Sequence, residues 1–514
     1  MASEQPQEDT RTISLKVLVE KQRNKVVLVE ATKDFVDTLF SFLSLPLGTI
    51  IRLLSNNDQQ QSSVSESSSF LGNINNLYRS VQNLNSEDVW NNPVCQQMLL
   101  HPRNPCEALC MKLFLNVDDT EPSNKILVCD HCNRFTTFQN LVCICGKPTN
   151  KHPKNLDSEG QTQGNSTIAD SKNGVFVKEN GSNFTVSLFD DLKIVPSSIM
   201  NALHLLNELG YSDLTQLEEI THKFGKQEIL NLLKYCLTSH EPLTNTILKR
   251  SSKNKDNLSC QFSSAQSVMS CSSNNSKIDI KVVQSKSQKK VVFAEANGDF
   301  VNFILSFLTM PLGSIIKLLG PNYFDGCVTN LYKSVENLDS SLCTCSHTVL
   351  LNPGVAPQFG FPKQLLNIPH AEHPLYYYGT GTSKQVYDSF THCYENVEAK
   401  IKGGVFSKKP ESIFNGRTLT ALDPRSPNRS KVVGFVKKEA LYGVGDDLTV
   451  KALSADFCLS YFKESSIPLD DLEVKVISIG EVEAMNILGA SLISKFTLTN
   501  GLGDFLKEST VTSN

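Results

Sequence analysis

One stretch of the chain occurs twice, and this repeat constrains the fold more than any other feature. Residues 25–54 read KVVLVEATKDFVDTLFSFLSLPLGTIIRLL, and residues 290–319 read KVVFAEANGDFVNFILSFLTMPLGSIIKLL. More than half of the paired positions are identical, and most of the others are conservative exchanges such as Arg52 for Lys317. A long internal repeat indicates that a supersecondary unit has been copied. We therefore expect two similar halves.

A second repeat follows each copy of the first. The triplet DDL at 190–192 returns at 446–448, and the stretch 214–245 returns at 469–500. The sequence thus predicts a tandem duplication of two small modules in the order A1–B1–A2–B2. The expected parts are a disordered tip (1–12), module A1 (13–150, with a zinc-ribbon-like hairpin at 126–148), a linker (151–172), module B1 (173–250), a flexible linker (251–276), module A2 (277–430, with a degenerate metal hairpin), module B2 (431–505) and a tail (506–514).

Hydrophobic periodicity predicts an α+β fold with mostly antiparallel sheets covered by helices. Residues 13–19 alternate as ISLKVLV and, together with 26–31, predict a β-hairpin. Apolar residues from Phe35 to Leu43 then recur at helical spacing, and Pro46 ends that helix. An isolated hairpin is seldom stable. We therefore expect this helix to cover the hairpin rather than to form a membrane-binding or partner-binding surface.

Three later stretches complete the secondary-structure prediction. Residues 111–117 alternate as MKLFLNV and predict a strand, whereas 214–224 and 226–237 predict two helices separated by Gly225. Helix pairs of this kind also occur in proteins that read DNA. The counterpart of the second helix begins with Glu481 and Glu483, whose charges would repel phosphate, so DNA reading by this pair is disfavoured.

Composition and charge indicate an intracellular protein. The formal net charge of -4 gives no general attraction to nucleic acid or to anionic membranes. The chain opens with polar and acidic residues rather than a secretory signal, and its most apolar run, 39–51, is too short to span a bilayer. Its 15 cysteines, an odd number, favour reduced thiols over a disulfide framework. We expect cytoplasmic or nuclear localisation and no membrane span.

Four cysteines in the first half have the spacing of a metal site. Cys129 and Cys132 form a C-x-x-C pair, and Cys143 and Cys145 follow as C-x-C-G. Two short thiolate knuckles on a hairpin supply the four tetrahedral ligands that zinc prefers. Four protein ligands leave no open position for a water, so the sequence predicts one structural rather than catalytic zinc per chain. Buried reduced thiols and a redox pair are the alternatives.

The second half does not keep this cysteine pattern. With the hairpins aligned, Cys129 and Cys132 fall opposite Tyr378 and Gly381, and the second knuckle falls opposite 392–394. Half of the ligands are gone, so we expect this copy to be metal-free. A different cluster, made of Cys343, Cys345 and His347, lacks a fourth ligand nearby and is a weaker candidate.

Adjacent carboxylates form the other group considered. Asp190–Asp191 and Asp446–Asp447 raise the question of acid–base chemistry or cation binding. Neighbouring side chains on a strand point to opposite faces, so a turn or strand-entry role is preferred. The sequence contains no nucleophile-elbow, zinc-protease or nucleotide-binding motif.

Several blocks of the sequence together carry a family resemblance. They are TISLKVLVEKQRNKVVLVEA, FLSLPLGTIIRLL, the CxxC…CxCG pattern and SIGEVEAMNILGASLISKFTLTNGL. On these blocks the chain resembles the plant-specific "domain of unknown function 674" family over nearly its whole length except the linkers. The resemblance implies an intracellular plant protein with a tandem arrangement. It brings no established activity, substrate or catalytic residues.

Three hypotheses for function follow. The preferred one is a non-enzymatic interaction or scaffold protein that holds a structural zinc and has a protein partner. The alternative is a zinc-ribbon-type nucleic-acid-associated protein, in which Lys147, Lys151 and Lys154 contact phosphate. The further alternative is an enzyme of unrecognised type, since catalytic groups often come from distant sequence positions.

Overall fold

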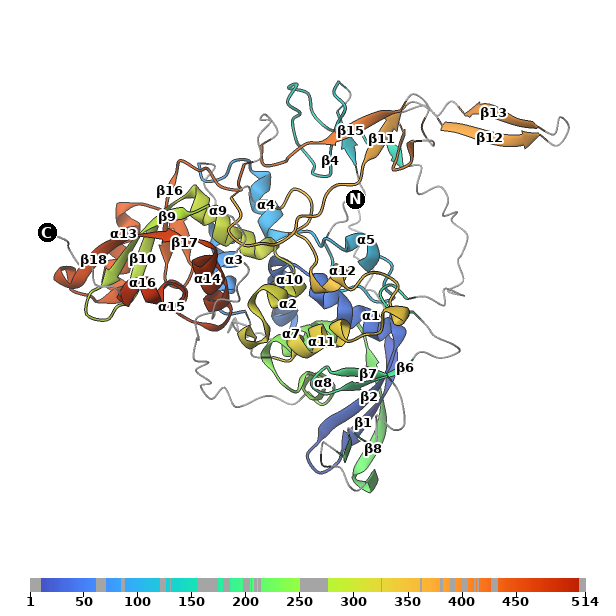
Figure 1. Cartoon of the computed structure of the whole chain (residues 1–514), viewed down its shortest axis with the longest axis horizontal. Coiled ribbons are helices and arrows are strands. Elements are labelled where there is room, and N and C mark those ends of the chain that lie inside the picture. The colour runs from blue at the N-terminus through green and yellow to red at the C-terminus, as the bar shows by residue number, and fades with distance from the viewer. Residues whose placement is uncertain are drawn as a thin grey trace.

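The computed structural model shows an α+β protein with three larger, mostly antiparallel sheets and a set of helices between them (Figure 1). It describes residues 11–507 except 62–70, 85–87, 121–125, 130, 156–173, 179–184, 197–203, 205, 208–209, 211–213, 250–275, 325, 361–362, 380–381, 389–392, 400–404, 411–412, 414–415 and 427–432. The predicted fold class is confirmed in this respect. The expected tip at 1–12, the linkers at 151–172 and 251–276 and the tail at 506–514 lie largely outside the described residues.

The first sheet joins strands from both expected modules of the first half. Its order is β7-β6-β2-β1-β8, with every pair antiparallel. The predicted hairpin is confirmed as β1 and β2, and the two expected modules A1 and B1 share one sheet. The strands are β1 (Ile13–Glu20), β2 (Lys25–Thr32), β6 (Thr185–Phe189), β7 (Ile194–Pro196) and β8 (Leu217–Phe224).

The helix predicted at 214–224 is wrong, because most of this stretch forms β8 after a single 3-10 turn at Leu214–Gln216. Strand β8 pairs with β1 along its whole length, from Ile13 opposite Phe224 to Glu20 opposite Leu217. This long antiparallel ladder outweighs the local helical pattern. With a strand in place of its first helix, the helix-turn-helix alternative no longer applies.

The second sheet has the same strand order as the first. It runs β17-β16-β10-β9-β18, and each strand stands at the position of its sequence counterpart in the first sheet. Figure 1 shows the two sheets at different ends of the molecule, with the helices between them. The strands are β9 (Ile278–Ser285), β10 (Val291–Asn297), β16 (Leu441–Gly445), β17 (Val450–Ala452) and β18 (Leu472–Ile479).

The third sheet is built jointly by the two halves. Its order is β3-β4-β15-β11-β14-β5, and the pairs β4–β15 and β5–β14, which are parallel, join one half to the other. Val128 of β3 also pairs with Lys151, just before β5, so the strand order closes into a ring. The ring strands are β3 (Leu127–Val128), β4 (Arg134–Thr136), β5 (Lys154–Asn155), β11 (Tyr376–Gly379), β14 (Val405–Ser407) and β15 (Arg417–Ala421).

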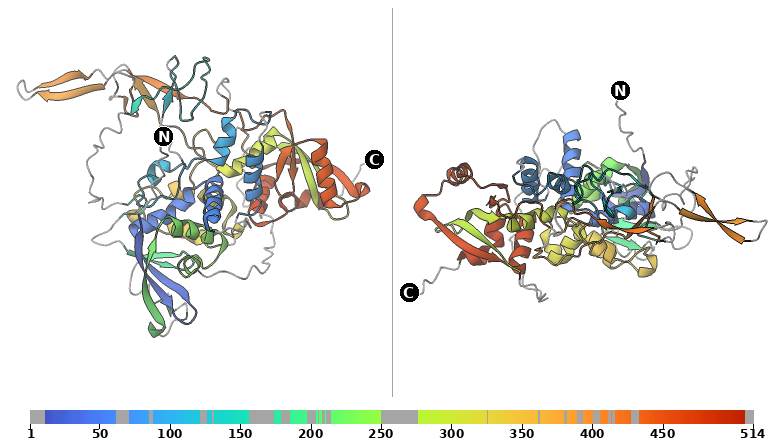
Figure 2. Two further views of the ribbon diagram at one scale, coloured as in Figure 1. Left: turned by 180° about the vertical axis from the view of Figure 1, so that it is seen from behind. Right: turned by 90° about the horizontal axis from the view of Figure 1, so that it is seen from above.

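A separate two-stranded hairpin extends from this ring. It consists of β12 (Thr382–Asp388) and β13 (Cys393–Ala399), which pair antiparallel. Figure 2 shows the hairpin projecting away from the body of the molecule. It occupies the part of the second half that aligns with the cysteine knuckles of the first half.

The helices contribute to one hydrophobic core that is shared with both five-stranded sheets, except that α13 packs on the second sheet in a separate cluster with Val292 and Phe293. They are α1 (Lys33–Ser41), α2 (Leu47–Gln61), α3 (Ile74–Asn83), α4 (Val94–Leu100), α5 (Glu107–Cys110), α7 (Lys226–Thr238), α8 (Pro242–Ile247), α9 (Gly298–Ser306), α10 (Leu312–Leu319), α11 (Val328–Glu336), α12 (Thr348–Leu351), α13 (Ala455–Ser465), α14 (Glu481–Ile493), α15 (Thr497–Gly501) and α16 (Gly503–Lys507). None of the helices in the described part of the chain combines the length and apolar character needed to cross a bilayer.

The repeated prolines lie where the two halves meet. Pro46 separates α1 from α2 as predicted, and it pairs with Pro311, which stands at the same place before α10. The backbone N–H of Leu47 donates to the carbonyl of Met310 (3.1 Å), and that of Leu312 donates to the carbonyl of Leu45 (3.0 Å). These two bonds join equivalent residues in a reciprocal way, which is the pattern of a local twofold axis.

Each half also places a helix against the sheet of the other half. Ser80 of α3 accepts a hydrogen bond from the backbone N–H of Val450 in β17 (2.9 Å). Its counterpart Ser334 of α11 accepts one from Ile194 in β7 (3.0 Å). The Ser80 contact is buried and the Ser334 contact is partly buried, and together they interlock the two halves.

The strand predicted at 111–117 is wrong. Leu113, Leu115 and Val117 are buried in alternation, as the pattern indicated, but the segment pairs with no other strand in the described part of the chain. It packs against α1 instead, where Leu115 offers its carbonyl to the Thr38 hydroxyl (3.1 Å). Alternation in the sequence predicts which side chains face a core, but it does not show whether a neighbouring strand is available for backbone hydrogen bonds.

Candidate metal centre

The first cysteine pair lies in the turn between β3 and β4. Cys129 follows β3 directly, and Cys132 comes two residues before β4. The N–H of Cys129 donates to the carbonyl of Arg134 (3.0 Å), and the N–H of Arg134 donates to the carbonyl of Cys132 (2.8 Å). These bonds close a tight knuckle, so both thiols emerge on the same side of the hairpin.

The second pair occupies a similar turn, where Val142 pairs with Pro148. The N–H of Cys143 donates to the carbonyl of Lys147, and the N–H of Gly146 donates to that of Cys143, both at 2.8 Å. Gly146 has a φ of 80°, a left-handed conformation that favours glycine. The glycine after the last cysteine therefore lets this second knuckle close.

The two knuckles bring all four sulfurs together. The Sγ atoms of Cys129, Cys132, Cys143 and Cys145 lie within 4.8 Å of one another, and those of Cys129 and Cys145 are 3.5 Å apart. A zinc–sulfur bond of about 2.3 Å in a tetrahedron requires sulfurs about 3.8 Å apart. The four residues predicted from the sequence thus form a cluster of the right size to hold a metal ion.

The protonation of these thiols reflects their crowding. A hydrogen bond from the backbone N–H of Lys147 is the main reason that the pKa of Cys145 falls to about 7. Hydrogen bonding to Cys145 is the main reason that the pKa of Cys132 rises to about 12. Cys145 therefore loses its proton more readily than an isolated thiol, and Cys132 loses its proton less readily. A cation is what would allow all four to be thiolates together.

The cluster is partly shielded by the ring of strands. Cys129 and Cys143 are buried, Cys132 is half-buried and Cys145 is exposed. Beneath it, Phe135 of β4 contacts His373 and Tyr376 edge-on, with ring centroids 5.4 and 5.2 Å apart. Tyr376 and Tyr378 of the second half also lie against the core of the ring.

The other sequence-predicted metal candidate is not assembled into a comparable cluster. Cys343 Sγ lies 3.1 Å from His347 Nε2, and burial raises the pKa of this thiol. Among the described residues, one group of three or more ligating side chains lies close enough to share an ion, and it consists of Cys129, Cys132, Cys143 and Cys145. Cys343, Cys345 and His347 do not form one.

The paired aspartates have the turn role that the sequence predicted. Asp190 and Asp446 follow β6 and β16, and their carboxylates accept hydrogen bonds from the backbone and hydroxyl of Thr244 and Thr499 respectively. Burial raises the pKa of both aspartates to about 6. These bonds fasten α8 and α15 to the turns of their sheets.

Sequence reasoning missed another repeated polar contact. Asp37 of α1 accepts three backbone N–H bonds from the segment 175–177, and its counterpart Asn302 of α9 accepts two from Phe435 and Val436. The two positions align within the first repeat, so an inward-facing polar residue at one site of an otherwise apolar helix was the available signal.

Comparison with known proteins gives one match. No curated protein and no solved structure matches this chain. A family model described as Protein of unknown function (DUF674) matches residues 9–482, a span that contains the four cysteines and all strands of the three larger sheets. The resemblance inferred from the sequence blocks is thereby confirmed at the level of the family. The chain belongs to the family Protein of unknown function (DUF674).

Proposed function

We propose that this protein is a non-enzymatic interaction or scaffold protein of plants that holds one structural zinc ion in the cytoplasm or nucleus. The observation that carries the proposal is that four cysteine sulfurs on two neighbouring turns lie within 4.8 Å of one another. An all-sulfur set of this kind is typical of closed structural zinc sites, in which the metal stabilises the fold.

The position of the cluster supports a role in holding the two halves together. Cys132 lies two residues before β4, and β4 pairs with β15 of the second half through Arg134 opposite Thr420. The N–H of Thr420 also donates to the carbonyl of Asn133, inside the knuckle itself (2.8 Å). A metal that fixes the knuckle would therefore also fix the edge on which the second half docks.

Metal analysis of purified full-length protein tests the zinc proposal. We expect about one zinc per chain, and Cys129→Ser and Cys143→Ser should each lose it. Cys343→Ser is the control, since Cys343 is half-buried, as Cys132 is, but lies outside the cluster, so its replacement should leave the zinc content unchanged. Cobalt-loaded protein should show the absorption bands of tetrahedral thiolate ligation. Metal-free wild-type protein, or full zinc retention by Cys129→Ser, would refute the assignment.

We further infer that the chain arose by tandem duplication of one ancestral unit. The identical strand order of the two five-stranded sheets supports this inference, as do the reciprocal bonds at Pro46 and Pro311 and at Ser80 and Ser334. Such an arrangement resembles a symmetric dimer fused into one chain. It presents two related sheets at different ends of the molecule, which suits a protein that brings partners together.

A further inference from the structure

The last strand of the second sheet, β18, pairs on one side only among the residues that the structure describes. Its partner is β9, along its whole length, and Figure 1 shows β18 at one end of the molecule. The N–H of Lys286 donates to the carbonyl of Asp471 (2.7 Å), one pair before the strand begins. Backbone groups of an antiparallel strand point alternately to its two sides. Those of Leu472, Val474 and Val476 therefore point to the free side.

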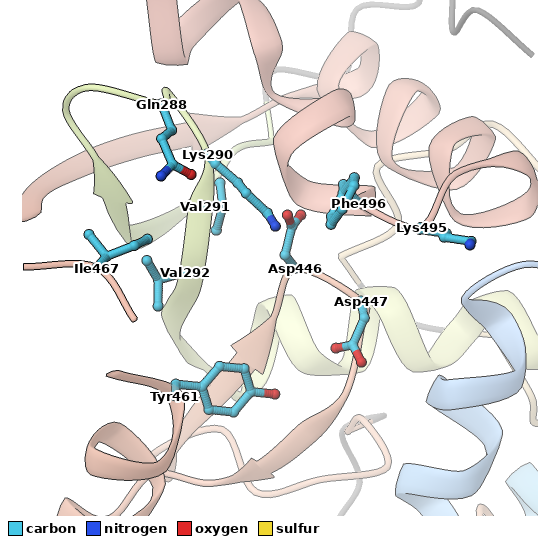
Figure 3. Close-up of a pocket in the computed structure, with 10 residues that line it drawn as sticks. All are labelled: Gln288, Lys290, Val291, Val292, Asp446, Asp447, Tyr461, Ile467, Lys495 and Phe496. Atoms are coloured by element: carbon cyan, nitrogen blue, oxygen red, sulfur yellow. The ribbon is translucent and has the colours of Figure 1, made fainter. Parts of the chain in front are cut away.

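The outward face of this strand is apolar and exposed. Val474 is 64% exposed and Val476 is 70% exposed. Val474 ends a row that crosses the sheet from Phe293 of β10 through Val283 of β9. Helix α13 covers the start of that row, where the ring of Tyr461, seen beside β10 in Figure 3, lies with its centroid 6.0 Å from that of Phe293. The apolar row thus runs from beneath a helix out to the free edge of the sheet.

The first sheet has the same row but ends it with a charge. There Leu28 of β2 and Leu18 of β1 lead to Glu219 of β8, which is the counterpart of Val474. Glu219 is exposed and forms an ion pair with Lys16 (3.5 Å). Charged side chains on an edge strand discourage pairing with a further strand. The second sheet lacks this protection at the equivalent position.

The charges of β18 indicate which partner fits its free side. Glu473 and Lys475 share the opposite face of the strand and stand on either side of Val474. Antiparallel pairing with a second copy, about a twofold axis through Val474, places Glu473 of each copy opposite Lys475 of the partner subunit. The same register places Leu472 opposite Val476 of the partner subunit. An axis at Lys475 would instead oppose two lysines, which is unfavourable. The strand is therefore complementary to itself.

We propose that the protein forms a homodimer in which two copies of β18 pair antiparallel about Val474. The second sheets of the two subunits then join into one continuous sheet, as in other interfaces built by strand addition. The pairing satisfies backbone groups that point to the free side, and burial of Val474 and Val476 adds to its stability. The inference rests on the proposed interaction role and specifies the partner as a second copy, but it needs nothing from the zinc site.

Analytical ultracentrifugation of full-length, zinc-loaded protein over a range of concentrations tests the dimer. The mass of the wild type should rise with concentration toward twice that of the chain. Val474→Glu introduces the residue that the first half has at this place, so it should fold and keep its zinc. It should weaken the dimer by about 100-fold or more, because two like charges would meet at the axis. Thr221→Glu adds the same charge to the edge strand of the first sheet and, as the matched control, should leave the dimer unchanged.

Crosslinking tests the register of the two strands. Val474→Cys places two thiols at the axis, so a short bismaleimide should link the subunits above the background of the wild-type cysteines. In the control Ser478→Cys the same register leaves the two thiols about 27 Å apart, and no link should form.

Three results would overturn the proposal. The first is a wild type that stays monomeric at its highest soluble concentration, which would leave the edge to a strand from a different protein. The others are a dimer that survives Val474→Glu and a link that forms through Ser478→Cys instead of Val474→Cys. The zinc content of the same samples reports on the metal site separately, so either proposal can fail alone.

Discussion

The buried carboxylate of Asp37 offers the most quantitative test of this structure. It is 2% exposed and accepts hydrogen bonds from Val175, Phe176 and Val177 at 2.6, 2.9 and 3.0 Å. Removal from water outweighs these bonds and raises its pKa from 3.8 to about 6. The equivalent position in the second half is Asn302, whose neutral amide oxygen accepts backbone hydrogen bonds from Phe435 and Val436.

The raised pKa fixes the sign of the effect on stability. The folded protein holds the proton more tightly than the unfolded chain does, so ionisation of Asp37 costs folding free energy as the pH rises through 6. The shift corresponds to about 3 kcal/mol in full, of which about 2 kcal/mol develops between about pH 4.5 and pH 7.5. Asp37→Asn removes this titration.

The predicted result is therefore a change with pH in the stability difference between the variant and the wild type. The stability of Asp37→Asn minus that of wild type should rise by about 2 kcal/mol from about pH 4.5 to pH 7.5. A constant offset is also expected, because the new amide group faces the N–H of Val175. Urea unfolding followed by the fluorescence of Trp90, the single tryptophan and a member of the shared core, measures the difference.

The mirror variant is Asn302→Asp. It should lose stability, and increasingly so at higher pH, since the Asn302 amide donates to the carbonyls of Gly298 and Val436 and a carboxylate would face both of them. A difference between Asp37→Asn and wild type that stays flat or falls with rising pH would show that the charge of Asp37 carries no folding cost, and the reasoning would be refuted.

Two further predictions concern the contact between the halves. Ser80→Ala and Ser334→Ala each leave a strand N–H without its acceptor, and each should lower the free energy of unfolding by about 1–3 kcal/mol, with the larger loss for Ser80→Ala because its contact is the more buried; a loss in one variant alone would contradict the reciprocal packing. Gly313→Ala should cost more than Gly48→Ala in thermal unfolding, because its methyl group would enter the Leu350 carbonyl, whereas the nearest atom at Gly48 is a side-chain carbon 2.9 Å away. Equal melting temperatures would contradict this.

Local sequence patterns predicted the parts of the structure that depend on nearest neighbours. The hairpin β1–β2, the helix break at Pro46 and the cysteine knuckles all follow from residues a few positions apart. Where the outcome depended on a distant partner, the patterns failed. The stretch at 214–224 has a helical pattern, yet β1 offers it an eight-residue antiparallel ladder. The stretch at 111–117 has a strand pattern, yet it pairs with no strand among the residues that the structure describes.

The sequence alone determined the internal repeat and the metal-site spacing of four cysteines in the first half. Both features can be read from the order and spacing of residues, without knowledge of three-dimensional contacts. Only the tertiary structure decided how the halves meet: α3 and α11 each contact the sheet of the other half, and the ring of strands is shared. These features arise from contacts between segments hundreds of residues apart, and the energy of such contacts depends on packing that no local pattern encodes.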